Sequence, residues 1–378
     1  MASTLHRSAH PALFVDEIIV EFLGHLHQPD SGIDDTNINA AGLTCKAWRD
    51  PSLTVKWREV DLKCLFSVLA PLHNPPFYYW HFTRVPTDSD HHRFHDVARR
   101  VHSLEDRGDL ELGETVFDTI YNGLPASTVL LPNLRSARIS AHIRTRCRFV
   151  VATRLLPLFP SSLSQLALSI GPNRDESRAI LVHDLVSRFS SLSSIKVHWA
   201  AETQTEVDAM VKLLEHNSDL RHVTIYHSTG SATTEALSKL PHLESLEIGT
   251  SGVSESLNYS GRLRLGPFAQ LKSLTIRFPL DATAFALLDN IGAHHSLQTL
   301  RMVSPPKESD LDATVDAVVK HPLLRNLSFR QLLVPTTRTV ALQVIATCTM
   351  LESLEINILV TSNTLTGQPP AHPSSMKS

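Results

Sequence analysis

The hexapeptide Leu243-Glu244-Ser245-Leu246-Glu247-Ile248 contains the spacing that decides the fold. The same spacing returns in Leu271-Lys272-Ser273-Leu274-Thr275-Ile276 and in Leu351-Glu352-Ser353-Leu354-Glu355-Ile356. In each copy, the first leucine is followed by apolar residues three and five positions later. Side chains alternate between the two faces of a strand, so the second and third apolar residues share one face. The spacing therefore predicts a short strand that is buried on one side.

This L-x-x-L-x-L pattern, with other apolar residues tolerated, recurs at steps of 23 to 29 residues. Its copies begin at Leu134, Leu163, Leu192, Leu220, Leu243, Leu271, Leu297, Leu324 and Leu351. Segments with helical spacing lie between several of them: Leu181, Leu185 and Phe189; Val207, Met210, Val211 and Leu214; Leu311, Val315 and Val318. Each repeat is therefore expected to be a strand followed by a helix, and neighbouring repeats to stack.

The pattern resembles the leucine-rich-repeat family over residues 126–360. The resemblance implies an α/β solenoid in which parallel strands form a concave sheet and helices lie outside. A fainter copy at Val101 and Leu104 extends the array toward the N-terminus. The second, fourth and sixth positions after each first leucine are expected to face solvent on the sheet.

Several of these solvent-facing positions are candidates for binding a target protein. The candidates are His198, Tyr226, Arg277, Arg301 and Arg330. The three arginines fall on successive predicted strands, so our hypothesis is that they grip an acidic or phosphorylated segment, because guanidinium groups bind carboxylate and phosphate bidentately. The alternative is a solvated face on which the arginines only maintain solubility.

The N-terminal segment has a different period. Phe14, Ile18, Phe22 and Leu26 share helical spacing and predict an amphipathic helix. A second helix is predicted over residues 38–48. Asp50-Pro51 is typical of an N-cap and first-turn proline, so a third helix is expected to begin there, with Leu53, Trp57 and Val60 on one face. Cys45 and Trp48 are expected to pack in the core.

The order of residues in this segment resembles the F-box families of mushroom-forming fungi. The resemblance rests on Val15-Asp16-Glu17-Ile18-Ile19, on Leu43-Thr44-Cys45-Lys46-Ala47-Trp48, and on Asp50-Pro51-Ser52-Leu53 followed by Trp57. It implies a helical module that binds a Skp-family adaptor and, through it, a cullin-RING ubiquitin ligase of the SCF type. The adaptor-binding residues would be Pro11, Phe14, Ile18, Phe22, Leu26, Leu43, Lys46, Trp48, Leu53 and Trp57.

These patterns divide the chain into five parts. We expect a tail over 1–9, the F-box-like domain over 10–62, a packed connector with a degenerate first repeat over 63–125, the solenoid over 126–360 and a disordered tail over 361–378. Two interpretations stay open. One is the substrate-receptor subunit of a ubiquitin ligase, and the other is a leucine-rich-repeat scaffold whose F-box is vestigial or serves outside degradation.

Composition excludes several other classes. The net charge of −3 gives no global excess of Lys and Arg that would indicate nucleic acid or anionic membrane as a partner. The four cysteines form no C-x-x-C pair, which indicates a reducing compartment, cytoplasmic or nuclear. His91 and His95, four residues apart, are a weak candidate for a metal site. No phosphate-binding loop or hydrolase motif is present, so we expect neither a cofactor nor enzymatic activity.

Overall fold

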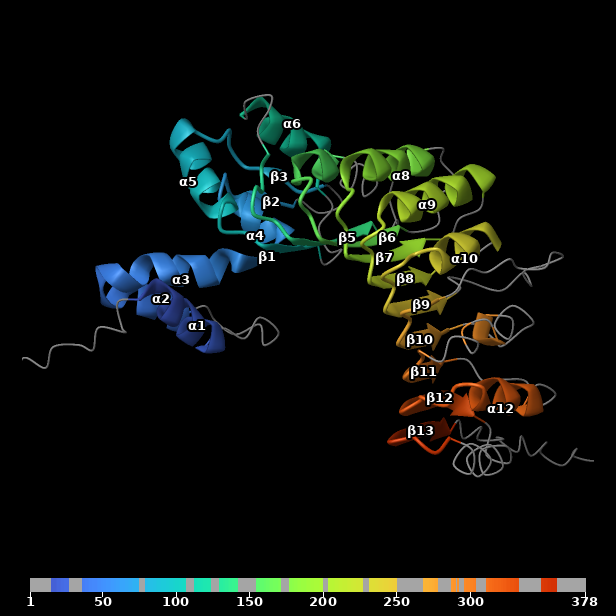
Figure 1. Cartoon of the computed structure of the whole chain (residues 1–378). Coiled ribbons are helices and arrows are strands. Elements are labelled where there is room, and N and C mark those ends of the chain that lie inside the picture. The colour runs from blue at the N-terminus through green and yellow to red at the C-terminus, as the bar shows by residue number, and fades with distance from the viewer. Residues whose placement is uncertain are drawn as a thin grey trace, which may run out of the picture. The chain divides into compact units, whose positions relative to one another are not determined.

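A computed structural model gives the fold and separates the chain into two compact units, residues 1–274 and 275–378. It describes residues 15–26, 36–74, 79–106, 112–123, 129–141, 154–170, 177–199, 203–226, 231–249, 268–277, 287–289, 291, 296–303, 311–332 and 348–358. Figure 1 shows the order of the elements along the chain. Each unit is described by itself below.

In residues 1–274, parallel strands are hydrogen-bonded in the order in which they occur in the chain. They are β1 (Glu59–Asp61), β4 (Ser103–Glu105), β5 (Ser136–Ala141), β6 (Gln165–Ile170), β7 (Ser194–Trp199), β8 (His222–Tyr226) and β9 (Ser245–Gly249). Each strand from β5 onward begins two residues after the first leucine of a copy. The backbone N–H groups before each strand also bond to the preceding repeat, as in Arg221 N–H to the Ser193 carbonyl at 2.8 Å.

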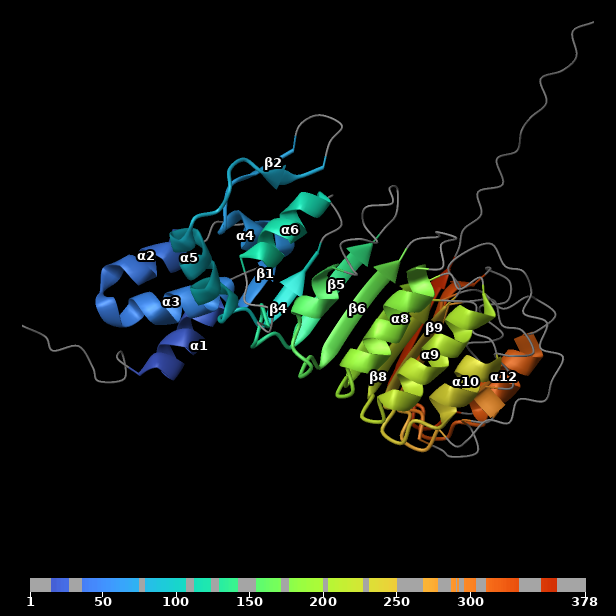
Figure 2. The same ribbon diagram turned by 90° about the horizontal axis from the view of Figure 1, so that it is seen from above.

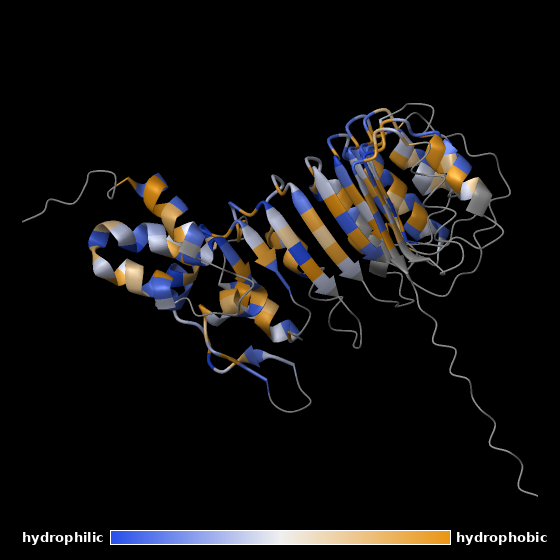
Figure 3. Cartoon of the chain, turned by 90° about the horizontal axis from the view of Figure 1, so that it is seen from below, coloured by the Kyte–Doolittle hydropathy of each residue, from blue (hydrophilic) through white to orange (hydrophobic). Residues whose placement is uncertain are grey.

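The register of these strands aligns apolar residues into rows. Leu166, Ile195, Val223 and Leu246 are successive partners, and so are Leu168, Val197, Ile225 and Ile248. All of these side chains are buried. Figure 3 shows the resulting alternation of hydrophobic and hydrophilic residues along the strands. The apolar rows form the core that the hexapeptide spacing predicts.

Helices cover one face of these strands. α8 (Ser177–Arg188), α9 (Gln204–His216) and α10 (Ser231–Ser238) lie in a row on that face (Figures 1 and 2), and a short 3-10 helix occupies Leu156–Leu158. The predicted helical residues Leu181, Leu185 and Phe189 are buried there. α9 begins with a capping box, in which Thr203 and Glu206 exchange backbone and side-chain hydrogen bonds of 3.1 and 3.3 Å.

The boundary between the two units falls inside strand β10 (Ser273–Ile276). In residues 275–378, β11 (Thr299–Met302), β12 (Asn326–Leu332) and β13 (Ser353–Ile358) are parallel and follow chain order. Helix α12 (Leu311–Val319) buries Val315 and Val318 as its spacing predicts. All nine predicted repeat strands are therefore present. The α/β class and the leucine-rich-repeat type of architecture are confirmed.

The described residues between 62 and 123 form a packed segment rather than a loose linker. It contains α4 (Leu62–Ser67), the antiparallel pair β2 (Leu72–His73) and β3 (His81–Phe82), α5 (Asp88–Ala98) and α6 (Glu114–Asn122). Phe66 of α4 meets Phe117 of α6 edge to face, with ring centroids 6.2 Å apart. The faint copy at Val101 and Leu104 is strand β4, and β1 pairs with it.

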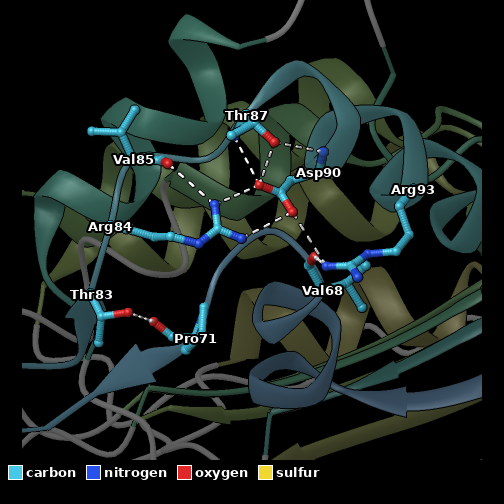
Figure 4. A network of polar contacts seen from close by, with 8 residues as sticks. All are labelled: Val68, Pro71, Thr83, Arg84, Val85, Thr87, Asp90 and Arg93. Carbon is cyan, nitrogen blue, oxygen red and sulfur yellow. Dashed lines mark hydrogen bonds and ion pairs between the residues drawn. The ribbon is translucent and has the colours of Figure 1, made fainter.

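A polar network fixes the start of α5 in this segment (Figure 4). Arg84 binds the Asp90 carboxylate with two nitrogens, at 2.6 and 3.1 Å. Thr87 donates to the same carboxylate from its backbone N–H and its hydroxyl, at 2.9 and 2.7 Å. Arg93 connects the network to the Val68 carbonyl at 2.7 Å. These hydrogen bonds from Arg84 and Thr87 hold the pKa of Asp90 well below its usual value.

The N-terminal helices are α1 (Asp16–Leu26), α2 (Thr36–Thr44) and α3 (Lys46–Arg58), which we call the three-helix module. Three expectations about helix boundaries are wrong. The second helix, predicted over residues 38–48, is α2 and ends at Thr44. α3 begins at Lys46, so Pro51 lies inside it rather than at its first turn, and Asp50 is not its N-cap. α3 also ends at Arg58, so Val60 lies in strand β1 instead of on the helix.

Candidate functional site

Helix α1 presents apolar residues on two sides. Ile19 and Leu23 are buried in the core of the three-helix module, together with Ile38 and Val55. Val15, Ile18 and Phe22, spaced three and four apart, are instead 41%, 49% and 52% exposed. Residues at this spacing lie on one face of a helix. α1 therefore carries an apolar stripe that the described part of the chain does not cover.

A groove of about 640 Å³ lies between α2 and α3. Its lining includes the apolar residues Ile38, Leu43 and Leu53 and the basic residues Lys46, Arg49 and Lys56. Leu43, at the end of α2, is 86% exposed. The hydroxyl oxygen of Ser52 is buried in the same groove and has no hydrogen-bond partner among the described residues. Among the described residues, no acidic side chain lines the groove, so this lining combines an apolar surface with positive charge.

The structure brings most of the predicted adaptor-binding residues onto this module. Leu43, Lys46 and Leu53 share the groove, and Phe22 meets Trp48 edge to face at a centroid distance of 6.1 Å. Trp57 is half-buried, with the Lys56 ammonium 5.7 Å from its ring centroid. Pro11 and Phe14 lie outside the described residues, as does the side chain of Leu26.

Cys45 corrects one expectation about the core. It is exposed, because it occupies the extended N-cap position between α2 and α3 and lines the groove. Trp48 is half-buried and packs against the core of the module, as expected.

Arg100 ties the three-helix module to the strands. Its guanidinium donates to the Asp50 carboxylate at 2.7 Å and to the Thr54 hydroxyl at 2.9 Å. The His102 N–H bonds the Arg58 carbonyl at 2.9 Å. The groove is therefore carried by a helix that is anchored at both its middle and its end.

A second candidate surface is the face of β4–β9 opposite to the helices, which we call the polar face. It follows the predicted solvent-facing positions, and in register these give the row Glu105, Arg138, Ala167, Lys196, Thr224 and Glu247 and the row Ser140, Ser169, His198, Tyr226 and Gly249. Arg138 and Glu105 form an ion pair at 2.8 Å. No described helix covers this face (Figure 3).

Two of the predicted target-binding residues meet on the polar face. The rings of His198 and Tyr226 are stacked, with centroids 3.8 Å apart and planes tilted by 33°. The Tyr226 hydroxyl donates to Glu247 at 2.5 Å. Lys196 places its ammonium 5.8 Å from the Tyr226 ring centroid. Lys196 and Glu247 were not among the predicted target-binding residues. Lys196 stands two positions before His198, and Glu247 two positions before Gly249, the register partner of Tyr226.

The arginine hypothesis concerns the second unit. Arg301 lies on β11, and its Nε is buried without a partner among the described residues. Its register partner on β12 is Ser328, and Arg330 lies two residues farther along that strand. Arg277 is exposed directly after β10. The side chain of Arg330 lies outside the described part, so joint binding of one anion stays a prediction.

The histidines of α5 lie beside a second groove of about 640 Å³, which His91, His92 and His95 line together with Asn122. Burial, and then the positive charge of neighbouring His91, lower the pKa of His95. Among the described residues, no group of three or more His, Cys, Asp or Glu side chains is placed to hold a metal ion.

Residues 135–154 contain a basic run of six arginines. Arg138 is paired with Glu105, and the Arg154 guanidinium lies 3.7 Å from the Asp118 carboxylate. Arg144, Arg146 and Arg148 lie outside the described residues. Within the described ranges, no helix has both the length and the apolar character needed to cross a membrane.

Comparisons with known proteins give only distant likenesses. No protein-family model matches the chain, and no curated protein matches it. A chain of the crystal structure of the yeast Rad7 and Elc1 complex has 15% identity and a TM-score of 0.39, covering 93% of this chain and 91% of that one. The leucine-rich repeat-containing protein LegL7 from Legionella pneumophila has 12% identity and a TM-score of 0.34, covering 65% of this chain and 81% of that one. The fold assignment therefore rests on strand register and burial.

Proposed function

We propose that this chain is a non-enzymatic substrate receptor, in which the three-helix module docks a Skp-family adaptor of a cullin-RING ubiquitin ligase and the strands select a target protein. The observation that carries the proposal is the uncovered apolar surface of the module. Ile18 and Phe22 on α1 and Leu43 on α2 expose large apolar side chains, although they belong to a unit with a small core. Exposed apolar side chains of this kind favour a protein partner.

The second support is the division of the chain into two kinds of surface. The three-helix module offers an apolar stripe and a groove with Lys46, Arg49 and Lys56, whereas the polar face of the strands carries serines, paired charges and a stacked His–Tyr pair. An apolar surface suits a constant partner, and an extended repeat surface suits a protein target. A receptor needs both surfaces on one chain.

The proposal is tested by co-purifying the full chain with a Skp-family adaptor. We expect wild type to retain the adaptor and the variants Phe22→Asp and Leu43→Asp to lose it, because each places a carboxylate in the apolar contact. Val85→Asp is the matched control, since Val85 is 84% exposed but lies outside the module. Circular dichroism checks that all variants stay folded.

Each result separates the two interpretations. If wild type retains no adaptor, the chain is a repeat scaffold without this docking function. If wild type and both module variants retain the adaptor equally, the docking surface is elsewhere and the role given to these residues is wrong.

A further inference from the structure

At the centre of the polar face, a group of small side chains, which we call the floor, lies beside two larger side chains. Ser140, Ala167 and Ser169 on β5 and β6 are small, whereas Lys196 and His198 on neighbouring β7 are long or ringed. Ser140 pairs with Ser169, and Ser169 pairs with His198, so these positions lie side by side across adjacent strands. An extended segment that lies over β5 and β6, parallel to the strands, therefore meets Lys196 and His198 from the side.

The charged side chains around this floor differ in their partners. Arg138 pairs with Glu105 at 2.8 Å, whereas Glu247 on β9 stays negatively charged and accepts the Tyr226 hydroxyl at 2.5 Å. The Lys196 side chain is exposed, and its ammonium has no ion pair with any described residue. This ammonium on β7, two strands from the Glu247 carboxylate on β9, complements a single carboxylate of a ligand. A phosphate monoester carries nearly two negative charges and binds best to clustered guanidinium groups, so it fits this arrangement less well.

The stacked rings supply the second feature of the surface. Tyr226 is only 9% exposed, whereas His198, its register partner on the neighbouring strand, is partly exposed. The hydrogen bond to Glu247 fixes the tyrosine ring, which in turn supports the imidazole that stacks beside it. A ring held in this way offers a flat surface against which an apolar side chain can pack.

Lys196 and His198 stand two residues apart on one strand, a separation of about 6.6 Å. Residues i and i+2 of an extended ligand are the same distance apart and point to the same side. We propose that the polar face binds an extended segment of the target. In this segment an Asp or Glu side chain contacts Lys196, and an apolar side chain two residues away contacts His198. That this segment belongs to a protein marked for degradation rests on the proposed function. The binding of such a segment does not.

The test uses an array of degenerate heptapeptides in which two positions are fixed. The fixed pairs are Glu-x-Leu, Gln-x-Leu, Glu-x-Gly and phosphoserine-x-Leu, and the probe is the labelled full chain. We expect Glu-x-Leu to retain about tenfold more protein than Gln-x-Leu, which corresponds to one charge-assisted hydrogen bond. Glu-x-Gly should be weaker than Glu-x-Leu because it lacks the apolar side chain.

Two variants locate the effect. Lys196→Gln should remove the difference between the Glu and Gln peptides, and His198→Ala should remove the difference between the Leu and Gly peptides. Lys212→Gln is the matched control, because Lys212 is an exposed lysine on helix α9, away from the polar face. It should behave as wild type.

The proposal is overturned if no peptide retains the protein, if Glu and Gln peptides bind equally, or if phosphoserine-x-Leu binds better than Glu-x-Leu. Equal losses in Lys196→Gln and Lys212→Gln would also overturn it, since they would reflect net charge alone. Adaptor co-purification is measured in parallel. If the adaptor is not retained but the peptides bind as expected, the ligase role is wrong and the peptide motif holds. If the adaptor is retained but the peptides do not bind as expected, only the peptide motif is wrong.

Discussion

The three-helix module and the strand array of residues 1–274 distribute their apolar side chains in opposite ways. In the module, α1 buries Ile19 and Leu23 but exposes Ile18 and Phe22. In the array, β8 buries Val223 and Ile225, and its other face carries Thr224 and the stacked ring of Tyr226.

The difference follows from what each region has available for packing. A strand in the array has a neighbour on each side and a helix layer on one face. Apolar residues are therefore needed only on that face, and the opposite face is free for polar residues. A module of three short helices has few neighbours and a small core. Some of its apolar side chains therefore stay exposed, as Ile18 and Phe22 do.

The largest effect on stability is expected from a charged substitution in the buried core of the strand array. Ile225→Asp places a carboxylate in a fully buried row without a partner, which costs several kcal/mol and should unfold the first unit. Thr224→Asp, one residue away on the polar face, stays in contact with solvent between Lys196 and Glu247 and should leave the fold intact. Circular dichroism and thermal melting compare the two. Similar melting of both variants would contradict the assignment of the two faces.

A smaller effect is expected from adjacent residues on α1. Leu23→Ala removes a core side chain that is fully buried and should lower the free energy of unfolding by about 2–5 kcal/mol. Phe22→Ala removes an exposed ring and should change stability by about 1 kcal/mol or less, yet it should weaken adaptor capture. Denaturant titration gives the first quantity and co-purification the second. If Phe22→Ala destabilises as strongly as Leu23→Ala, Phe22 belongs to the core and not to a docking surface.

The smallest effect on stability is expected at Asp90 of α5, in the segment between the three-helix module and the strand array. Because the hydrogen bonds from Arg84 and Thr87 lower the pKa of Asp90, the folded chain favours the charged carboxylate more than the unfolded chain does. The stability that this gives is therefore present above the ordinary carboxyl pKa of about 3.9 and is lost as pH falls below it.

Asp90→Asn should accordingly lower the melting temperature at neutral pH, and its difference from wild type should shrink in acid. Asp96→Asn, on the same helix, removes only an exposed pair with Arg99 and should have a weaker effect at all pH values. A difference for Asp90→Asn that does not depend on pH would show that the network stabilises the fold by packing rather than through the charge.

The strands could be predicted from sequence because their signal repeats. Each copy gives the same spacing of three and five residues, and the register then aligns residues such as Leu246 and Ile248 with their neighbours. The polar face follows from the same period, which is why His198 and Tyr226 could be chosen as candidates. Their stacking could not, because it depends on the register between β7 and β8, which lie 28 residues apart along the chain.

The boundaries in the three-helix module were harder to predict because distant contacts outweigh local signals. Asp50-Pro51 is typical of a helix start, yet Arg100 binds the Asp50 carboxylate and the Thr54 hydroxyl from 50 and 46 residues away. Val60 continues the helical spacing of α3, but β1 pairs with β4 and ends the helix at Arg58. Neither contact can be read from the residues around positions 50 to 60.

The direct passage from α3 to β1 has a mechanical consequence. Arg58 is the last residue of the helix and Glu59 the first residue of the strand, so no spare chain lies between them. Glu59 is in an extended conformation, and the Arg58 carbonyl is held by the His102 N–H at 2.9 Å. No residue between α3 and β1 lies outside regular structure. A rotation of α3 would therefore act directly on the edge strand β1 as torque.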